Sequence, residues 1–357
     1  MNGAISMADT TSGNVSTEPP DPAKGKGIDS TLGLWAGITF CVLYTVLIWA
    51  LKPYMPKINF AADQGAFDYL WKLTDPSFWS RATAWTGYVL HQSLLWGLIY
   101  YAQSNKLKYS KGLHPVNIIA LSGSAVFILL HLVQTQYFYD GLAQDVHIMS
   151  AQASVVFLLV MVIMMENRRR GMFFGKKAPF LETSADFLRK YHGYYFSWAV
   201  IWTFWYHPME TTQGHLLGTL YTCLIMIQGS LFFTRAHLNS WWTGFVEVMV
   251  LIHGTMVALM AANNGPWAQF FFGFLGMFIV TQMHGFGFSR WLKWAFGAAY
   301  IMGVVIVYGG RNWTTMDELI RIPAVEFLLV FAVAGVIWAG MWAVGRLTGR
   351  DREKVSV

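Results

Sequence analysis

Histidine is the residue that gives this 357-residue chain its chemical interest, because seven of its ten histidines fall in or beside long apolar stretches. An imidazole in hydrocarbon costs several kcal/mol unless it is paired, bound to a metal or in contact with water. The set therefore indicates a functional interior, with ligands for a metal or cofactor or a relay for protons. The seven are His91, His131, His147, His207, His215, His253 and His284.

The densest group lies in WYHPMETTQGHLLG, where His207, Glu210 and His215 come within nine residues around Pro208. Because a proline cannot continue a helix, side chains from two successive helices can converge at this turn. Imidazole and carboxylate are usual ligands of zinc, iron or copper. A second stretch, YFYDGLAQDVHIM, places His147 beside aspartates that can orient its ring. We predict one metal site built from His147, His207, Glu210 and His215.

Other histidines extend the candidate set. His253 and His284 are further candidate metal ligands, and His91, His131 and His253 are candidate cofactor ligands. A di-haem protein needs axial histidines at matched depth, and His91 with His253, or His131 with His215, would provide such pairs. Spacing alone does not choose between haem and a bare copper, iron or zinc ion. The plainer interpretation of any one of these residues is a polar side chain that bonds between helices.

The elements that position these residues are helices long enough to cross a bilayer. The chain is 55% hydrophobic and only 12% charged, well below the roughly 25% charged residues of soluble domains. Apolar runs of about 20 residues recur along it. They predict an all-helical, polytopic membrane bundle of about ten transmembrane helices. The predicted spans are 32–52, 80–102, 115–138, 146–166, 192–207, 213–234, 241–262, 267–287, 291–310 and 322–345.

We expect a single transmembrane domain over residues 31–346. Residues 1–30 are rich in Ser, Thr, Pro and Gly and predict a disordered cytoplasmic tail, and 347–357 form a second cytoplasmic tail. Cys41 and Cys223 fall inside apolar runs and are predicted to be packing residues. One acid, Glu247 in FVEVMVLIHG, lies inside a span and needs a partner.

The distribution of basic residues predicts the orientation. The arginine-rich stretch 167–190 and the basic C-terminal tail fall on one side of a ten-span chain, whereas loops 139–145, 208–212 and 263–266 hold no Lys or Arg. The positive-inside rule then places both termini in the cytoplasm, although the first and ninth loops, which carry Lys and Arg on the other side, depart from it. His131, His147, His207 and His215 form a non-cytoplasmic layer in this topology, and His284 lies near the cytoplasmic side.

Five short stretches, in order over residues 86–287, resemble motifs of the eukaryotic transmembrane protein 45 family, a multispan family with a domain of unknown function. They are TGYVLHQSLLWGL (86–98), DVHIMSAQASVVFLL (145–159), WYHPMETTQGHLLG, LIHGTMVAL (251–259) and FIVTQMHGF (278–286). Tyr88 stands where that family has a histidine, and His253 replaces a glutamine. The resemblance implies a seven- or eight-helix core with extra terminal helices. It adds weight to His147, His207, His215, His253 and His284 as a set and implies no reaction.

These observations favour a membrane metalloprotein, redox-active, in which intramembrane histidines hold a transition metal or haem that acts on a lipid-soluble or periplasmic substrate. Two alternatives stay open: a transporter or channel that uses the histidines as a proton or metal-ion relay, and a structural scaffold. The expected partners are the lipid bilayer and a small molecule or metal ion. The basic residues are scattered over short loops, which argues against nucleic acid. The sequence has no phosphate-binding glycine loop and no nucleophile elbow.

Overall fold

The computed structural model describes residues 27–62, 69, 71–260 and 266–347. Over these residues the protein is all-helical and contains no strand, as predicted. Each predicted span overlaps one α-helix. The helices are α1 (Ser30–Ala50), α2 (Phe78–Ser104), α3 (Pro115–Phe138), α4 (Met149–Arg170), α5 (Glu182–Tyr206), α6 (Gln213–Ser230), α7 (Ser240–Met260), α8 (Trp267–Val280), α9 (Arg290–Gly310) and α10 (Glu318–Leu347). Most of the predicted tail 1–30, and all but Leu347 of the tail 347–357, lie outside the described residues.

Within the described part of the chain, six helical segments are long and apolar enough to cross a membrane, which supports a multi-pass membrane protein. They are α1, α3, α4, α7, α9 and a segment over 313–347 that includes α10. The predicted count of about ten spans is not confirmed. Helix α5 opens with the charged stretch ETSADFLRKYH, and α8 has only 14 residues, so neither meets the length and composition of a span by itself.

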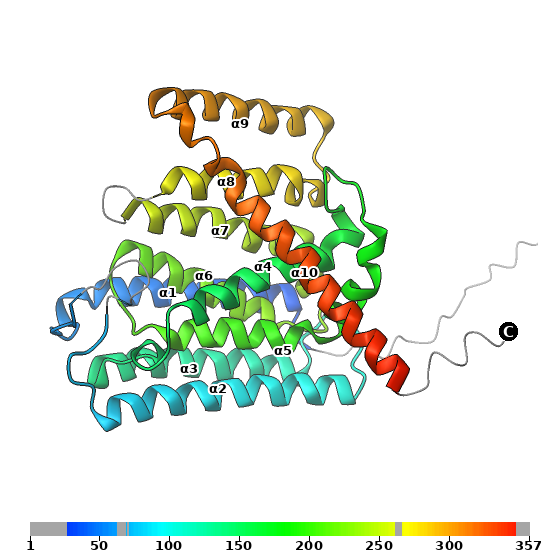
Figure 1. The fold of residues 1–357 in the computed structure, drawn as a ribbon. Helices are drawn as coiled ribbons and strands as arrows, with labels where there is room; N and C mark the ends of the chain where they lie inside the picture. The colour runs from blue at the N-terminus through cyan, green and yellow to red at the C-terminus, as the bar shows by residue number, and fades with distance from the viewer. Residues whose placement is uncertain (1–26, 63–68, 70, 261–265, 348–357) are drawn as a thin grey trace, which may run out of the picture.

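Most helices from α4 to α9 lie antiparallel to the next helix in the chain, as do α2 and α3, whereas α1 packs against α6. Helix α10 crosses obliquely over α8, α4 and α5 (Figure 1). The bundle therefore has two ends. At the Pro208 end, α5 passes into α6 and α3 passes into α4; at the Arg170 end, α4 passes into α5 and α6 into α7. Local sequence fixes several helix starts, because Asp29, Ser77 and Thr212 accept hydrogen bonds from backbone N–H groups in the first turn.

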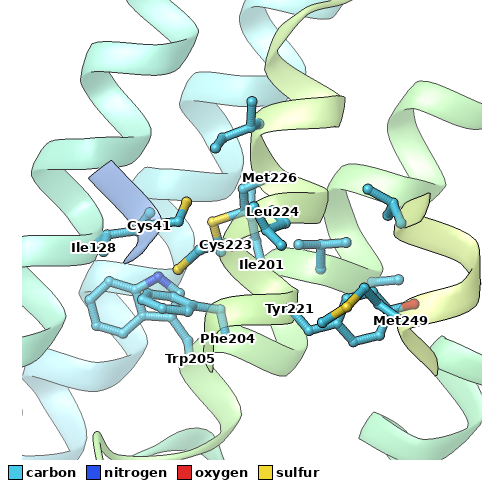
Figure 2. Packing of buried hydrophobic residues seen from close by; sticks show 14 of the residues in the cluster. Cys41, Ile128, Ile201, Phe204, Trp205, Tyr221, Cys223, Leu224, Met226 and Met249 are labelled. Atoms are coloured by element: carbon cyan, nitrogen blue, oxygen red, sulfur yellow. The ribbon is translucent and has the colours of Figure 1, made fainter. Parts of the chain in front are cut away.

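The largest buried cluster fills the space between α1, α3, α5 and α6, where large side chains interdigitate. Trp205 is almost fully buried in it, and Figure 2 shows Cys41 and Cys223 among Ile128, Ile201 and Trp205. Both cysteines are buried and unlinked. Gly87 on α2 allows Trp205 this close approach, since a Cβ at Gly87 would stand 2.1 Å from the indole ring.

The intramembrane acid Glu247 has its partner in Arg170, the last residue of α4. Arg170 Nη1 donates to Glu247 Oε2 at 2.5 Å, and the two side chains are only 1% and 9% exposed. The ion pair joins α4 to α7 at the Arg170 end of the bundle. Arg170 Nη2 is buried with no hydrogen-bond partner among the described residues. The pair is therefore strongly desolvated and only partly satisfied by hydrogen bonds.

Candidate functional site at the Pro208 turn

The turn between α5 and α6 is held by side chains of α3. His131 Nε2 lies 2.7 Å from the carbonyl oxygen of His207, and the N–H of Met209 donates to Thr135 Oγ1 at 3.0 Å. Pro208 has no N–H to satisfy. On the other side of the turn, a Cβ on Gly141 would stand 2.4 Å from the carbonyl oxygen of Tyr206, so the segment after α3 packs directly against this backbone. The turn is thus closed by protein groups on both sides.

Two predicted cofactor ligands, His131 and His91, use both ring nitrogens in hydrogen bonds. A carbonyl only accepts, so His131 Nε2 carries the hydrogen and Nδ1 must accept. Nδ1 lies 3.1 Å from Gln134 Oε1, and the two form a hydrogen bond with the neutral ring when the Gln134 amide is turned to present its NH2 group. An indole only donates, so His91 Nδ1 accepts from Trp205 Nε1 at 3.4 Å, and His91 Nε2 bonds to Ser124 Oγ at 3.2 Å. In these arrangements neither ring has a free nitrogen for a haem iron.

His207 and His215 differ, because each keeps an unused ring nitrogen. Their ring centres are 5.6 Å apart and their planes nearly perpendicular. His207 Nδ1 lies 3.1 Å from the hydroxyl of Tyr69, which leaves Nε2 available. His215 Nε2 is buried and has no hydrogen-bond partner among the described residues. An imidazole nitrogen left buried and unpaired is unfavourable by about 1–3 kcal/mol, which makes this atom the most informative in the site.

Aromatic rings surround the two histidines. The ring of Tyr69 lies 5.2 Å from His207 and 5.6 Å from Tyr206, and the ring of Trp71 lies 5.3 Å from His215. Tyr69 and Trp71 come from the segment between α1 and α2, far from the turn in sequence. The histidine pair is therefore enclosed mainly by aromatic side chains, with few polar groups to compete for its nitrogens.

Glu210 and His253, also predicted as ligands, lie at the edges of this cluster. Glu210 accepts a hydrogen bond from the hydroxyl of Tyr139 and another from the N–H of Thr211. Burial and this carboxylate raise the pKa of Tyr139 above its usual value, so the phenol stays protonated and keeps donating. His253 on α7 packs against α6 at Gly218, where an added Cβ would stand 2.8 Å from His253 Nε2. Its ring centre lies 6.0 Å from that of Tyr221.

The structure places two other predicted ligands apart from the pair. His147 is exposed, and its Nδ1 accepts from the N–H of Met149 at the start of α4. His284 lies at the Arg170 end, in the short helix η6 (Gln282–Gly285), with Nε2 3.1 Å from the carbonyl oxygen of Ile279. Across residues 27–62, 69, 71–260 and 266–347, no three or more His, Cys, Asp or Glu side chains are already grouped to hold a metal ion.

Several residues of functional interest were not predicted from the sequence. Tyr69, Trp71 and Trp205 gave no signal, because aromatic residues are abundant throughout this chain. Glu326 is different: it is a buried acid within the apolar run of α10, only 6% exposed. Like Glu247, it is an acid inside an apolar run, where an unpaired charge is costly, so its position in the sequence alone could have predicted it as a candidate.

Comparison with known proteins places this arrangement in no established group. No family model, no curated protein and no solved structure matches the chain. The resemblance to the transmembrane protein 45 family stays a prediction. The histidine pair and its surroundings are therefore the evidence that bears on function.

Proposed function

We propose that this protein is a membrane metalloprotein that binds one transition metal ion at His207 and His215. The observation that carries the proposal is the buried, unpartnered Nε2 of His215 beside a second imidazole with an unused nitrogen. Buried polar atoms in folded proteins nearly always have partners, and an orphan at a cluster of ligand-type residues points to a bound group. A metal ion shared by the two rings would satisfy both nitrogens at once.

The spacing of the pair fits such an ion. With metal–nitrogen bonds of about 2.1 Å, two imidazoles that share one ion have ring centres roughly 5–6.5 Å apart. The observed separation is 5.6 Å. His253 is a candidate third ligand, since it is close enough to interact electrostatically with both rings.

Of copper, iron and zinc, copper(I) fits the surroundings of the histidine pair best. It accepts low coordination numbers, and imidazole and thioether groups are suitable ligands. The thioether of Met260 lies near His215, because its Sδ accepts a hydrogen bond at 3.1 Å from the N–H of Gly214, the residue before His215. Haem is less well supported, since His91 and His131 are fully hydrogen-bonded. We further propose that the bound metal carries out redox chemistry on a lipid-soluble or periplasmic substrate. The oxidisable rings of Tyr69 and Trp71 lie beside the histidine pair and suit one-electron transfer.

The test is metal binding by the purified full-length chain and by a His215→Leu variant. Each protein is equilibrated with copper(I) under reducing conditions, desalted, and analysed for metal content. We expect close to one copper per chain in the parent and background levels in His215→Leu. The metal-free variant should stay folded, because leucine replaces a buried unpaired nitrogen by an apolar group, although it also removes the hydrogen bond between the His215 ring and the Pro208 backbone.

Two matched controls make the result specific. His147→Ala changes an exposed histidine at the same end, and His284→Gln changes a hydrogen-bonded histidine at the other end; both should keep the metal. If the parent binds no metal while His215→Leu is stabilised, the scaffold alternative replaces the proposal. If all three variants lose metal equally, no localised site exists at the Pro208 turn.

A further inference from the structure

An apolar groove runs between α1, α3 and α6. Its volume is 570 Å³, and its walls are almost entirely apolar. Ala36 and Ala125 keep it open because their side chains are small, and Leu32 and Ile118 form part of its exposed rim. The volume is within the range of about 300–1,000 Å³ typical of small-molecule sites.

A smaller polar cavity adjoins the groove at the Arg170 end of the bundle. Its volume is 250 Å³, and it is lined by Asp29, Ser30, Thr31, Lys111 and Arg235. The two cavities share a wall, because Ile28 and Leu113 line the groove while Asp29 and Lys111 line the polar cavity. Backbone hydrogen bonds tie these segments together, from Leu113 N–H to the Ile28 carbonyl and from Ser30 N–H to the Lys111 carbonyl.

The polar cavity carries a net positive charge. Lys111 and Arg235 contribute +2 and Asp29 contributes −1, which leaves +1. The carboxylate of Asp29 is already engaged, since its Oδ1 accepts from the N–H of Thr31 at 2.7 Å and caps α1. Neither Lys111 nor Arg235 has a carboxylate within ion-pair distance in the described part of the chain. Among the described residues, Lys111 has only a longer-range interaction with Asp29, so both cations can bind an anion.

We propose that these cavities form one binding site for an anionic phospholipid. Its phosphate headgroup binds Lys111 and Arg235, and one acyl chain lies in the groove between α1, α3 and α6. Basic pockets between membrane helices recognise anionic headgroups, and an apolar groove open to the bilayer accepts a chain. A phospholipid matches both features at once, whereas a neutral apolar molecule would leave the two cations without a partner. The site is separate from the proposed metal site and does not depend on it.

The test measures which lipids stay bound to the protein. The full chain is purified in detergent from vesicles that contain equal amounts of phosphatidylglycerol and phosphatidylcholine, and the retained lipids are quantified by native mass spectrometry. We expect phosphatidylglycerol to be strongly enriched. With a gain of about fivefold for each cationic side chain near an anionic lipid, the Lys111→Gln/Arg235→Gln variant should lose about 25-fold in selectivity. Lys111→Arg/Arg235→Lys, which preserves both charges, should stay selective.

Filling the groove tests the chain-binding part. Ala36→Phe/Ala125→Phe should lower retention of both lipids, whereas Ala339→Phe, at an exposed position on α10, should not. Lys176→Gln/Lys177→Gln removes the same charge from exposed positions at the same end of the bundle and should leave selectivity unchanged. The proposal fails if the parent retains no excess of phosphatidylglycerol or if this control loses selectivity equally. It also fails if retained lipid is neutral and indifferent to Lys111→Gln/Arg235→Gln, which would indicate a neutral occupant.

Discussion

The buried ion pair between Arg170 and Glu247 makes a quantitative prediction about stability. The two side chains are 1% and 9% exposed, and their closest atoms are 2.5 Å apart. Removing one partner leaves the other as an uncompensated buried charge, which costs about 3–5 kcal/mol. Arg170→Met and Glu247→Leu should each lower the free energy of unfolding by that amount. The double variant should cost far less than the sum, and can equal or exceed the parent in stability, because it removes both desolvated charges.

The measurement is reversible unfolding in mixed micelles, in which SDS is titrated into detergent-solubilised protein and helix content is followed by circular dichroism. The control is Arg169→Met. Arg169, the neighbour of Arg170 in sequence, pairs with Glu166 three residues earlier on the same helix, but the two side chains are 34% and 27% exposed. An exposed pair contributes about 0–1 kcal/mol. If Arg170→Met costs no more than Arg169→Met, or if the double variant loses the sum of the single losses, the reasoning from burial is refuted.

Three further predictions concern the Pro208 end. Gly141→Ala should destabilise the protein and displace the turn, since the new Cβ would stand 2.4 Å from a backbone oxygen of Tyr206 that cannot move aside; unchanged unfolding in SDS would contradict this. Gly87→Leu should displace Trp205, because a Cβ at Gly87 would stand 2.1 Å from its indole ring. The displacement should shift the tryptophan fluorescence spectrum, and an unchanged spectrum would show that the ring keeps its place. Burial raises the pKa of Asp140 above its usual value. The folded state therefore binds this proton more tightly than the unfolded state, and stability is lost as pH rises through the folded pKa. Asp140→Asn should abolish that loss in unfolding curves between pH 4 and pH 8, and an unchanged pH dependence would exclude Asp140 as its source.

The helices could be predicted from the sequence because apolar runs of sufficient length leave few alternatives to helix in a membrane. The proline at 208 likewise placed His207 and His215 at facing helix ends, and the structure brings their rings within contact. The number of spans could not be fixed. Helices such as α8 are apolar but short, and their ability to span depends on packing against neighbours rather than on composition.

The sequence does not show which histidine ring nitrogens have hydrogen-bond partners and which do not. His131 was a candidate ligand by its place in an apolar run, but its Nε2 bonds to a carbonyl 76 residues away. The partner of Glu247 is 77 residues away in sequence. Tyr69, which covers His207, lies between α1 and α2 in a segment with no helical periodicity. Each of these contacts is set by the tertiary arrangement of helices, which local pattern does not specify.

The closure of the Pro208 turn by His131 and Thr135 has a consequence for the charge state that the proposed site would favour. Side chains of α3, rather than water, make hydrogen bonds with the backbone of the turn. The medium around the histidine pair should therefore have a low dielectric constant. The Born cost of transferring an ion from water grows with the square of its charge, so a divalent ion is penalised about four times as strongly as a monovalent one. Copper bound at this turn should therefore have a high reduction potential and resist oxidation, a property that voltammetry of the copper-loaded protein can measure directly.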